Sequence, residues 1–516
     1  MQTAFVNADV VTLDPAHPRA RGVLVSDGRV ERLLDDRPTG LSRDVAVVDC
    51  SGGAVVPGFH DCHVHLTDTG LLAGKHDVRD CADIAAILKR VTELGDSLLY
   101  AGNFEEDRIA ERRPPLRAEL DSVAPSRPVL LTRVDGHSCV VNSAALALIG
   151  VEKLDGAEKD HAGAPTGRLS GPANYVGQSE FLRRLPIEAR RKADERAAQI
   201  ALHAGITTAH NVIIGDYALE RLEDEYRANR SLPLRVISKS CSTNVAKIKR
   251  LGARIFGGDI FVDGSIGSRT AAVADAYCDG PHVGDGGPGK GEAASGRGLL
   301  YLTREQLFEV YDEAAEAGLS LGVHAIGDRA IEESLAAWEA VIAKRGPLTN
   351  LRPSIDHFEI AHPEQIARAA RCGILLSMQP AFDYLWGGDA GMYAQRLGAE
   401  RARMMNLFRT AKRVGCVVCG GSDSPVTPFS AVLGIHSLVN HHVVEERLTV
   451  EEALRAYTSD AGRLSFDETR RGAIAPGYDA DFAVLELNLE ALPVESIKDA
   501  RVIMTIVAGE IKYRAL

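Results

Sequence analysis

The chain has 516 residues, more than one ordinary domain of roughly 100–200 residues, and 45% of its residues are hydrophobic. Its formal net charge is −12. This charge argues against nucleic acid and against an anionic membrane as partners, because either would select a basic surface. The sequence shows no signal-peptide pattern and no transmembrane run, so we expect a cytoplasmic protein. Its nine cysteines are scattered and odd in number, and they do not indicate a disulfide framework.

The first 57 residues alternate short β-like runs with turns rich in Pro, Gly and Asp. Similar runs return only near the other end of the chain, in DFAVLELN and VIMTIVAGEIKYR. We therefore expect residues 1–57 and 475–516 to form one small β-sandwich built from both termini.

The middle of the chain alternates apolar, β-branched runs with stretches of helical periodicity. The eight runs are AVVPGFHD, GITTAHN, LRVISKSC, DIFVDGS, LSLGVHAIGD, PSIDHFE, GILLSMQP and GCVVCGGSD. This pattern predicts an α/β fold, a (β/α)8 TIM barrel over residues 58–74 and 174–474. Residues 75–173, inserted after the first strand, contain a ninth run, RPVLLTRVDGHS, and predict a lobe or lid over the barrel mouth.

Five histidine and aspartate residues stand at the C-terminal ends of predicted strands. They are His63, His65, His324, His357 and Asp423. These ends meet at the functional face of a barrel, so the five side chains are expected to converge. In a His-x-His segment of extended chain, both imidazoles point to the same side. Two neutral imidazoles and a carboxylate suit a borderline cation such as zinc and leave a position open for water.

Several motifs of the chain resemble those of the amidohydrolase superfamily. They are PGFHDCHVH (57–65), DGSIGSRTA (263–271), VHAIGDRAI (323–331) and GGSDSPVTP (420–428). Within the superfamily they resemble the YtcJ-like group, which includes N-substituted formamide deformylases and is similar to D-aminoacylases. Two longer segments, 120–146 and 448–464, extend the resemblance over nearly the whole chain in the right order.

The resemblance implies that a water activated by one or two divalent metals attacks a carbonyl carbon. His63, His65 and Asp423 would hold the first metal, and His324 and His357 would hold the second where it is present. Asp423 would also act as the proton shuttle, taking a proton from the attacking water and delivering it to the leaving nitrogen. We expect zinc, with one ion more firmly predicted than two.

The chain departs from the family pattern on the fourth strand, where many members carry a carboxylated lysine that bridges two metals. The matching position is Asp259, in GGDIFVDGS. Asp259 could be an anionic bridging ligand, although its reach is shorter. Alternatively, the site holds one metal and Asp259 hydrogen-bonds a ligand histidine. In a third interpretation Lys239, at the end of the neighbouring run, supplies the bridge; a buried or ion-paired structural lysine is the alternative for that residue.

Four further residues are weaker candidates for substrate binding. Asp263 and Arg269 lie in a Gly-containing segment that could approach a ligand, or they could form an internal pair in a tight turn. His137, in VDGHSC, could reach into the site from the inserted lobe. His210 ends the second run and could line the mouth, with a structural histidine as the equal alternative.

The first functional hypothesis is hydrolysis of a C–N bond in an amide, formamide or cyclic amide of a small molecule. An ester or lactone hydrolase would use the same site. Ring deamination is disfavoured, because such deaminases place a His-x-x-Glu pair near strand five, where this chain has HAIGD. A metal-free binding or regulatory member is the alternative from another class, and the complete ligand set argues against it. Barrels of this kind often dimerise, so a homodimer stays open.

Overall fold

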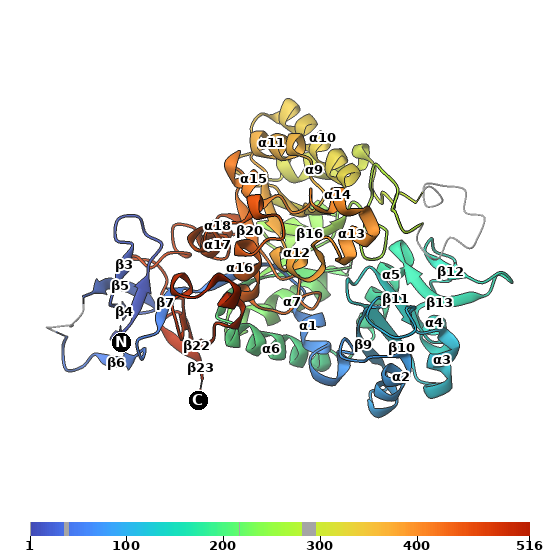
Figure 1. Ribbon diagram of the computed structural model, residues 1–516, viewed down its shortest axis with the longest axis horizontal. Helices are drawn as coiled ribbons and strands as arrows, with labels where there is room; N and C mark the ends of the chain where they lie inside the picture. The colour runs from blue at the N-terminus through green and yellow to red at the C-terminus, as the bar shows by residue number, and fades with distance from the viewer. Residues whose placement is uncertain (1, 36–40, 216, 281–295, 516) are drawn as a thin grey trace.

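The computed structural model describes residues 2–35, 41–215, 217–280 and 296–515. Its elements form three parts: a β-rich terminal unit, a central α/β unit and a lobe (Figure 1). In the view of Figure 1 the terminal unit lies on the left and the lobe at the lower right. No described helix is both long enough and apolar enough to cross a bilayer.

The terminal unit consists of two sheets. One has the order β5-β4-β1-β6 and contains β1 (Gln2–Val6), β4 (Gly22–Ser26), β5 (Arg29–Leu34) and β6 (Ala46–Asp49). The other has the order β23-β22-β21-β7-β2-β3 and contains β2 (Asp9–Val11), β3 (Arg19–Ala20), β7 (Ala54–Pro57), β21 (Phe482–Leu485), β22 (Val502–Val507) and β23 (Glu510–Arg514). Both sheets contribute to one apolar cluster, in which the rings of Phe5 and Phe482 meet edge to face at 5.8 Å. Both ends of the chain therefore share one core.

The central unit holds eight parallel strands in two hydrogen-bonded arcs. The first arc, in the order β15-β14-β8, contains β8 (Phe59–Val64), β14 (Ile206–Ile213) and β15 (Arg235–Ser240). The second, β16-β17-β18-β19-β20, contains β16 (Ile255–Phe261), β17 (Ser320–Ala325), β18 (Ser354–His357), β19 (Leu375–Met378) and β20 (Val418–Gly420). A single bridge between Val64 and Ser424 joins β8 to the segment after β20. The arrangement is barrel-like, but the ladder among the described residues does not run all the way round.

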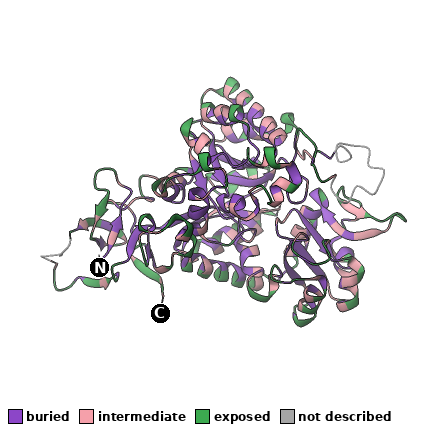
Figure 2. Ribbon diagram, viewed as in Figure 1, coloured by how far each residue is buried: buried purple, intermediate pink, exposed green. Residues whose placement is uncertain are grey.

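Helices connect and surround these strands, most of them on the outside. They are α1 (Leu66–Leu71), α6 (Ile187–His203), α7 (Leu219–Arg230), α8 (Val245–Arg250), α9 (Arg304–Glu316), α10 (Asp328–Arg345), α11 (Pro363–Cys372), α12 (Pro380–Trp386), α13 (Met392–Leu397), α14 (Ala399–Ala402), α15 (Phe408–Arg413), α16 (Ala431–Val439), α17 (Val450–Ala456) and α18 (Ser459–Leu464). Figure 2 shows buried strands inside and exposed outer faces on these helices. The helix α11 ends at Gly373, whose φ of 67° satisfies the left-handed conformation of a helix C-terminus.

The lobe is a five-stranded sheet with helices around it. Its order is β12-β13-β11-β10-β9, with β9 (Leu99–Phe104), β10 (Val129–Arg133), β11 (Ser138–Val141), β12 (Ala157–Lys159) and β13 (Pro165–Ser170). Its helices are α2 (Ile84–Glu93), α3 (Arg117–Val123), α4 (Ser143–Ile149) and α5 (Gly171–Arg183). Phe181 of α5 belongs to the same apolar cluster as Leu146 and Leu169, so the lobe continues past the predicted limit at residue 173.

The lobe contacts the central unit beside the strand ends. Tyr175 of α5 stacks on Phe261, the last residue of β16, with ring centroids 4.1 Å apart and planes inclined by 11°. Offset aromatic stacking of this kind adds roughly 0.5–1.5 kcal/mol beyond the burial of its area. The contact places the lobe over the C-terminal ends of the parallel strands.

Candidate metal centre and active site

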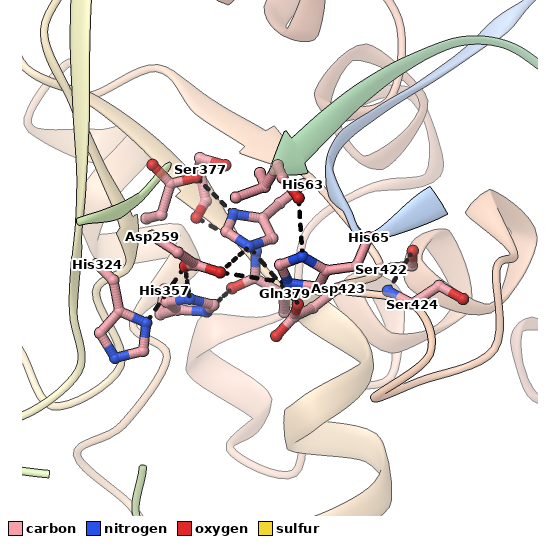
Figure 3. A network of polar contacts seen from close by, with 12 residues as sticks. His63, His65, Asp259, His324, His357, Ser377, Gln379, Ser422, Asp423 and Ser424 are labelled. Carbon is pink, nitrogen blue, oxygen red and sulfur yellow. Dashed lines mark hydrogen bonds and ion pairs between the residues drawn. The ribbon is translucent and has the colours of Figure 1, made fainter. Parts of the chain in front are cut away.

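Six buried side chains converge where the parallel strands end (Figure 3). This set, the metal-facing set, comprises His63, His65, Asp259, His324, His357 and Asp423. The residues come from β8 and the turn after it, β16, β17, β18 and the segment after β20. His357 and Asp423 have φ values of 73° and 54°, a region that costs a non-glycine residue roughly 1–3 kcal/mol. Two of the converging residues therefore carry backbone strain.

The first cluster within the set contains the two histidines of the His-x-His motif. Oδ1 of Asp423 lies 3.1 Å from Nε2 of His65 and 3.6 Å from Nε2 of His63. The ligand atoms that these three residues can offer all lie within 4.8 Å of one another. Two imidazoles and one carboxylate at this spacing fit a divalent metal.

Asp259 lies between the two pairs of histidines. Its Oδ2 is 3.4 Å from Nε2 of His63 and 3.3 Å from Nε2 of His65. Its Oδ1 is 3.5 Å from Nδ1 of His324 and 3.6 Å from Nε2 of His357. Each oxygen of this carboxylate therefore faces a different histidine pair.

The second ring nitrogen of each histidine is held by a fixed partner. The pairs are His63 Nδ1 with Asp356 at 2.8 Å, His65 Nδ1 with the carbonyl of Val212 at 3.1 Å, His324 Nε2 with the carbonyl of Gly264 at 3.1 Å, and His357 Nδ1 with Gln379 at 2.7 Å. A carbonyl or carboxylate oxygen accepts a hydrogen bond, so the ring nitrogen that it faces carries the hydrogen. The other nitrogen then keeps its lone pair for a metal, as ligand histidines generally require.

Several of the converging atoms are buried without a hydrogen-bond partner. They are Nε2 of His63, Nδ1 of His324, Oδ1 of Asp259 and Oδ1 of Asp423. An unsatisfied buried polar atom costs roughly 1–3 kcal/mol, so four at one point are unusual in a folded protein. Cations placed here would satisfy these atoms, and the donors fit them: the ligand atoms of His63, His65 and Asp423, and those of His63, Asp259 and His357, lie within 4.8 Å of one another.

The carboxylates also make this point attractive to positive charge. Burial by itself lowers the pKa of His63, but Asp259 and Asp356 outweigh it and raise that pKa to about 9. A cation at the centre would therefore compete with protons for the histidine nitrogens.

A cavity with two arms opens onto the metal-facing set. The volume in which the centre of a water molecule fits is about 100 Å³ in the main arm and about 30 Å³ in the side arm. Aromatic residues of the main arm are Tyr100, Tyr175, Tyr217 and Phe261. Apolar residues of the side arm include Ile266, Ile326, Phe382, Trp386 and Met392. Both arms reach His357 and Asp423, so a substrate could extend to either side of the centre.

A model of the Amidohydrolase family matches residues 46–513. The chain belongs to the amidohydrolase family. It is 29% identical to the amidohydrolase YtcJ of Bacillus subtilis, over 95% of this chain and 94% of the relative. It is 27% identical to the N-substituted formamide deformylase of Arthrobacter pascens, over 99% of this chain and 98% of the relative. These relatives confirm the YtcJ-like group, and the family places the chain among hydrolases.

A solved structure supports the fold. The crystal structure of a metal-dependent hydrolase from Pyrococcus furiosus matches with a TM-score of 0.73 at 24% identity, covering 95% of this chain and 99% of that chain. The amidohydrolase therefore has a TIM-barrel-like α/β fold. Its strand order agrees with the alternation in the sequence, while its irregular ladder beside β16 could not be anticipated. Gly257 and Gly258 there have φ values of 84° and 93°, outside strand geometry.

Lys239 of the amidohydrolase lies outside the metal-facing set. Its Nζ donates to the carbonyl of Cys62 at 3.4 Å and lies 3.6 Å from Oδ1 of Asp356. It is buried beside Gly258, where a Cβ would come within 3.3 Å of Nζ. The ammonium pairs with the carboxylate that orients His63.

Asp263 and Arg269 serve the local backbone. The Asp263 carboxylate accepts hydrogen bonds from the backbone amides of Ala272, Ile326 and Gly327 at 2.8–3.0 Å. Arg269 donates to Asp279 at 3.0 Å, so the alternative of an internal pair between Asp263 and Arg269 is wrong. Neither residue lines the described cavity arms, which corrects their assignment to substrate.

The two remaining histidine candidates differ in position. His210 is fully buried and lines neither arm, so the structure does not bring it to the mouth. His137 of the lobe lines both arms, and its ring centroid lies 5.0 Å from that of His324. Burial, with the nearby charge of His324, lowers the pKa of His137 to about 3. The His137 ring is therefore neutral near pH 7.

The residues that hold the converging histidines and the lobe are not among those predicted from the sequence. Asp356 and Gln379 orient His63 and His357, and Asp135 anchors the lobe turn to Ser265 and Ser268 at 2.6 and 2.8 Å. Asp356 directly precedes a strand-end histidine, a signal that could have been used. Nothing in the sequence joins Asp135 to serines 130 and 133 residues further along the chain.

Proposed function

We propose that this amidohydrolase uses one or two divalent metals, most simply zinc, to hydrolyse a C–N bond of a small amide, formamide or cyclic amide. The convergence of unpartnered, buried histidine and carboxylate atoms at the junction of two cavity arms carries the proposal. Nothing else among the described residues combines such a donor set with access from a cavity.

The residues present divide into two ligand groups. His63, His65 and Asp423 would hold the first metal, and His324 and His357 the second. Asp259, with one oxygen toward each pair, would serve both, which supports the bridging alternative over a purely orienting role. When bound, the metals lower the pKa of a water and polarise the substrate carbonyl.

Asp423 is the proposed proton carrier. It lines both arms and lies within 3.1 Å of His65, so it reaches the centre and the space for the substrate. The carboxylate accepts a proton from the attacking water as the oxygen bonds to the carbonyl carbon. It then delivers that proton to the leaving nitrogen as the C–N bond breaks, giving a carboxylic acid and an amine.

The unequal arms support a substrate with one small and one larger side. The side arm, with a volume of about 30 Å³ for the centre of a water molecule, suits a formyl or similarly small acyl group. The aromatic main arm suits a larger apolar or aromatic substituent on nitrogen. The name of the Arthrobacter relative, a formamide deformylase, agrees with this division.

Metal analysis and a substrate panel test the proposal. Protein purified after zinc or manganese supplementation is analysed for metal and assayed with N-formyl amines, N-acyl amino acids, cyclic amides and matched esters. We expect at least one equivalent of metal and hydrolysis of an N-formyl amine that a chelator abolishes and added metal restores. Less than about half an equivalent would overturn the metal-dependent function. Faster cleavage of the matched ester at every acyl size would replace the amidase assignment by an esterase.

A further inference from the structure

His137 reaches the active site from the lobe rather than from the barrel. It lines both arms where they meet the metal-facing set. Its ring lies against the rings of His324 and Phe261, with centroids 5.0 and 5.5 Å away. The residue is only 8% exposed, so its ring is largely shielded from bulk water.

The two nitrogens of this ring have different surroundings. Nδ1 lies 2.6 Å from the hydroxyl oxygen of Tyr175. Nε2 forms no hydrogen bond with any residue in the described part of the chain, and it keeps some contact with solvent. A neutral imidazole carries one proton, so the partner at Nδ1 decides whether Nε2 can donate.

The ring is held in place from two directions. The backbone amide of His137 donates to Oδ1 of Asp135 at 3.2 Å, and Oδ2 of Asp135 accepts from Ser265 and Ser268 of the barrel. On the other side, Tyr175 is fixed by its stack on Phe261. Donors that are already positioned before the reaction need no reorganisation in the transition state.

We propose that His137 is a catalytic residue whose Nε2–H donates to the carbonyl oxygen of the substrate, and that the Tyr175 hydroxyl donates to Nδ1 to maintain this tautomer. The proposal rests on the hydrolytic function proposed above. As water adds to the carbonyl carbon, negative charge develops on that oxygen. A fixed donor in a site shielded from water stabilises the developing charge more than the neutral carbonyl.

The roles of His137 and Asp423 are complementary. Asp423 carries a proton from the water to the nitrogen, whereas His137 keeps its proton throughout. Tyr175 acts as a positioning residue, because it contacts the imidazole and determines which nitrogen bears hydrogen. The lobe therefore supplies part of the catalytic machinery in addition to shaping the cavity.

Two substitutions of His137 test the proposal: one removes the N–H donor, and the other replaces the ring but keeps an N–H donor. Removing one such donor typically lowers kcat by roughly 100–1000-fold. We expect His137→Ala to show a loss of this size with little change in KM and an unchanged metal content. His137→Gln, whose amide nitrogen can occupy the place of Nε2, should recover part of the loss. A His137→Ala variant with wild-type kcat, or one that loses metal, would overturn the assignment.

Tyr175→Phe keeps the stack on Phe261 and removes the hydroxyl. We expect a smaller decrease in kcat, on the order of 10-fold, because the unwanted tautomer becomes accessible. Tyr311→Phe is the matched control: Tyr311 is also buried and stacked, on Trp338 at 4.0 Å and 14°, but lies outside both arms. Equal effects of the two substitutions would contradict a positioning role for Tyr175.

The tautomer can be observed without an assay. In zinc-loaded protein labelled with ¹⁵N-histidine, long-range ¹H–¹⁵N correlation spectra identify the protonated nitrogen, and the His137→Gln spectrum assigns the residue. We expect hydrogen on Nε2 in the wild type, and hydrogen on Nδ1 would overturn the proposal. Wild-type protein that binds no metal and cleaves no member of the panel would instead refute the proposed function, so the two failures are distinguishable.

Discussion

The metal-facing set of the barrel and the lobe turn above it, residues 133–137, both bury several charges but satisfy them differently. In the turn, Arg133 donates to Glu106 at 2.8 Å and to Asp135 at 2.7 Å, and Asp135 accepts two further hydroxyl donors. In the metal-facing set, by contrast, four atoms converge without partners. Among the fully buried side-chain atoms of the turn, only Nη2 of Arg133 is left without a hydrogen-bond partner, and the carboxylate of Asp135 is fully paired within the protein. The four converging atoms of the metal-facing set would gain their partners from a cation.

From this difference we expect the largest loss of function when a residue of the metal-facing set is removed. His63→Ala deletes a nitrogen that both carboxylates approach. We expect loss of the first metal, undetectable turnover and a lower melting temperature, because metal binding is coupled to folding. Metal analysis, assay and thermal unfolding measure the three effects. His161→Ala, at an exposed position of the lobe, is the control and should change none of them.

The second largest effect is expected where one residue has two duties. Asp423→Asn keeps an oxygen that can contact a metal but removes the group that accepts a proton. General acid–base groups contribute roughly 100–10,000-fold, so we expect a loss of kcat in this range with most metal retained. Metal content measured beside kcat distinguishes this from simple metal loss. An unchanged kcat would remove Asp423 from proton transfer.

Asp259→Asn tests whether the centre holds one metal or two. If Asp259 bridges, the metal content should fall from two equivalents to one, because His63, His65 and Asp423 retain the first site. Wild-type protein with one equivalent would favour the alternative in which Asp259 only orients a ligand. A variant that still holds two would show that the bridge is dispensable. Asp328→Asn is the control: the Asp328 carboxylate accepts a hydrogen bond from the backbone amide of Ala274 and lies outside both arms.

The convergence of the proposed histidine ligands is predictable from the sequence because each stands at the end of a recognisable strand. Alternating apolar runs place His63, His324 and His357 at strand ends, and parallel strands bring those ends together. The choice between Asp259 and Lys239 was not predictable, because both stand near strand ends and only side-chain direction separates them. Gly258 leaves room for the Lys239 side chain beside it. That local geometry has no signature in periodicity.

The lobe marks the limit of the sequence reasoning. A ninth β-like run predicted an insertion, and the structure places a sheet there. The contact of Asp135 with Ser265 and Ser268 joins two motifs that the sequence presents as separate. The sequence alone therefore leaves Asp263 and Arg269 as weak candidates for substrate binding, although their segment supports the backbone and receives the lobe.

Breaking the lobe turn should affect stability more than metal binding. Asp135→Asn removes a largely buried charge that pairs with Arg133, which keeps its second pair with Glu106. The cost should therefore be below the roughly 3–5 kcal/mol of breaking a fully buried pair. We expect a lower melting temperature and a moderate decrease in kcat, with full metal content. Asp121→Asn, which affects a side-chain contact with Ser143 elsewhere in the lobe, should lower kcat less than Asp135→Asn does. Loss of metal in Asp135→Asn would show that the turn also supports the barrel ligands.

The smallest expected effect is on the pH dependence of stability, which should differ between the metal-facing set and the lobe turn. The barrel carboxylates raise the pKa of His63 to about 9 against the effect of burial, whereas His in an unfolded chain has a pKa of roughly 6.5. The folded state then binds this proton more tightly, so the stability it contributes is full below about pH 6.5 and is lost as pH rises through 9.

Bound zinc reverses the trend, because protons compete with the metal for the histidines as the pH falls. Asp135 of the lobe turn contributes nothing in this window, since Arg133 and hydroxyl donors outweigh burial and lower its pKa to about 2. We therefore expect the melting temperature of chelator-treated protein to fall between pH 6.5 and 9, and that of zinc-loaded protein to stay level or rise. Parallel curves for the two forms would mean that zinc does not replace these protons and binds elsewhere.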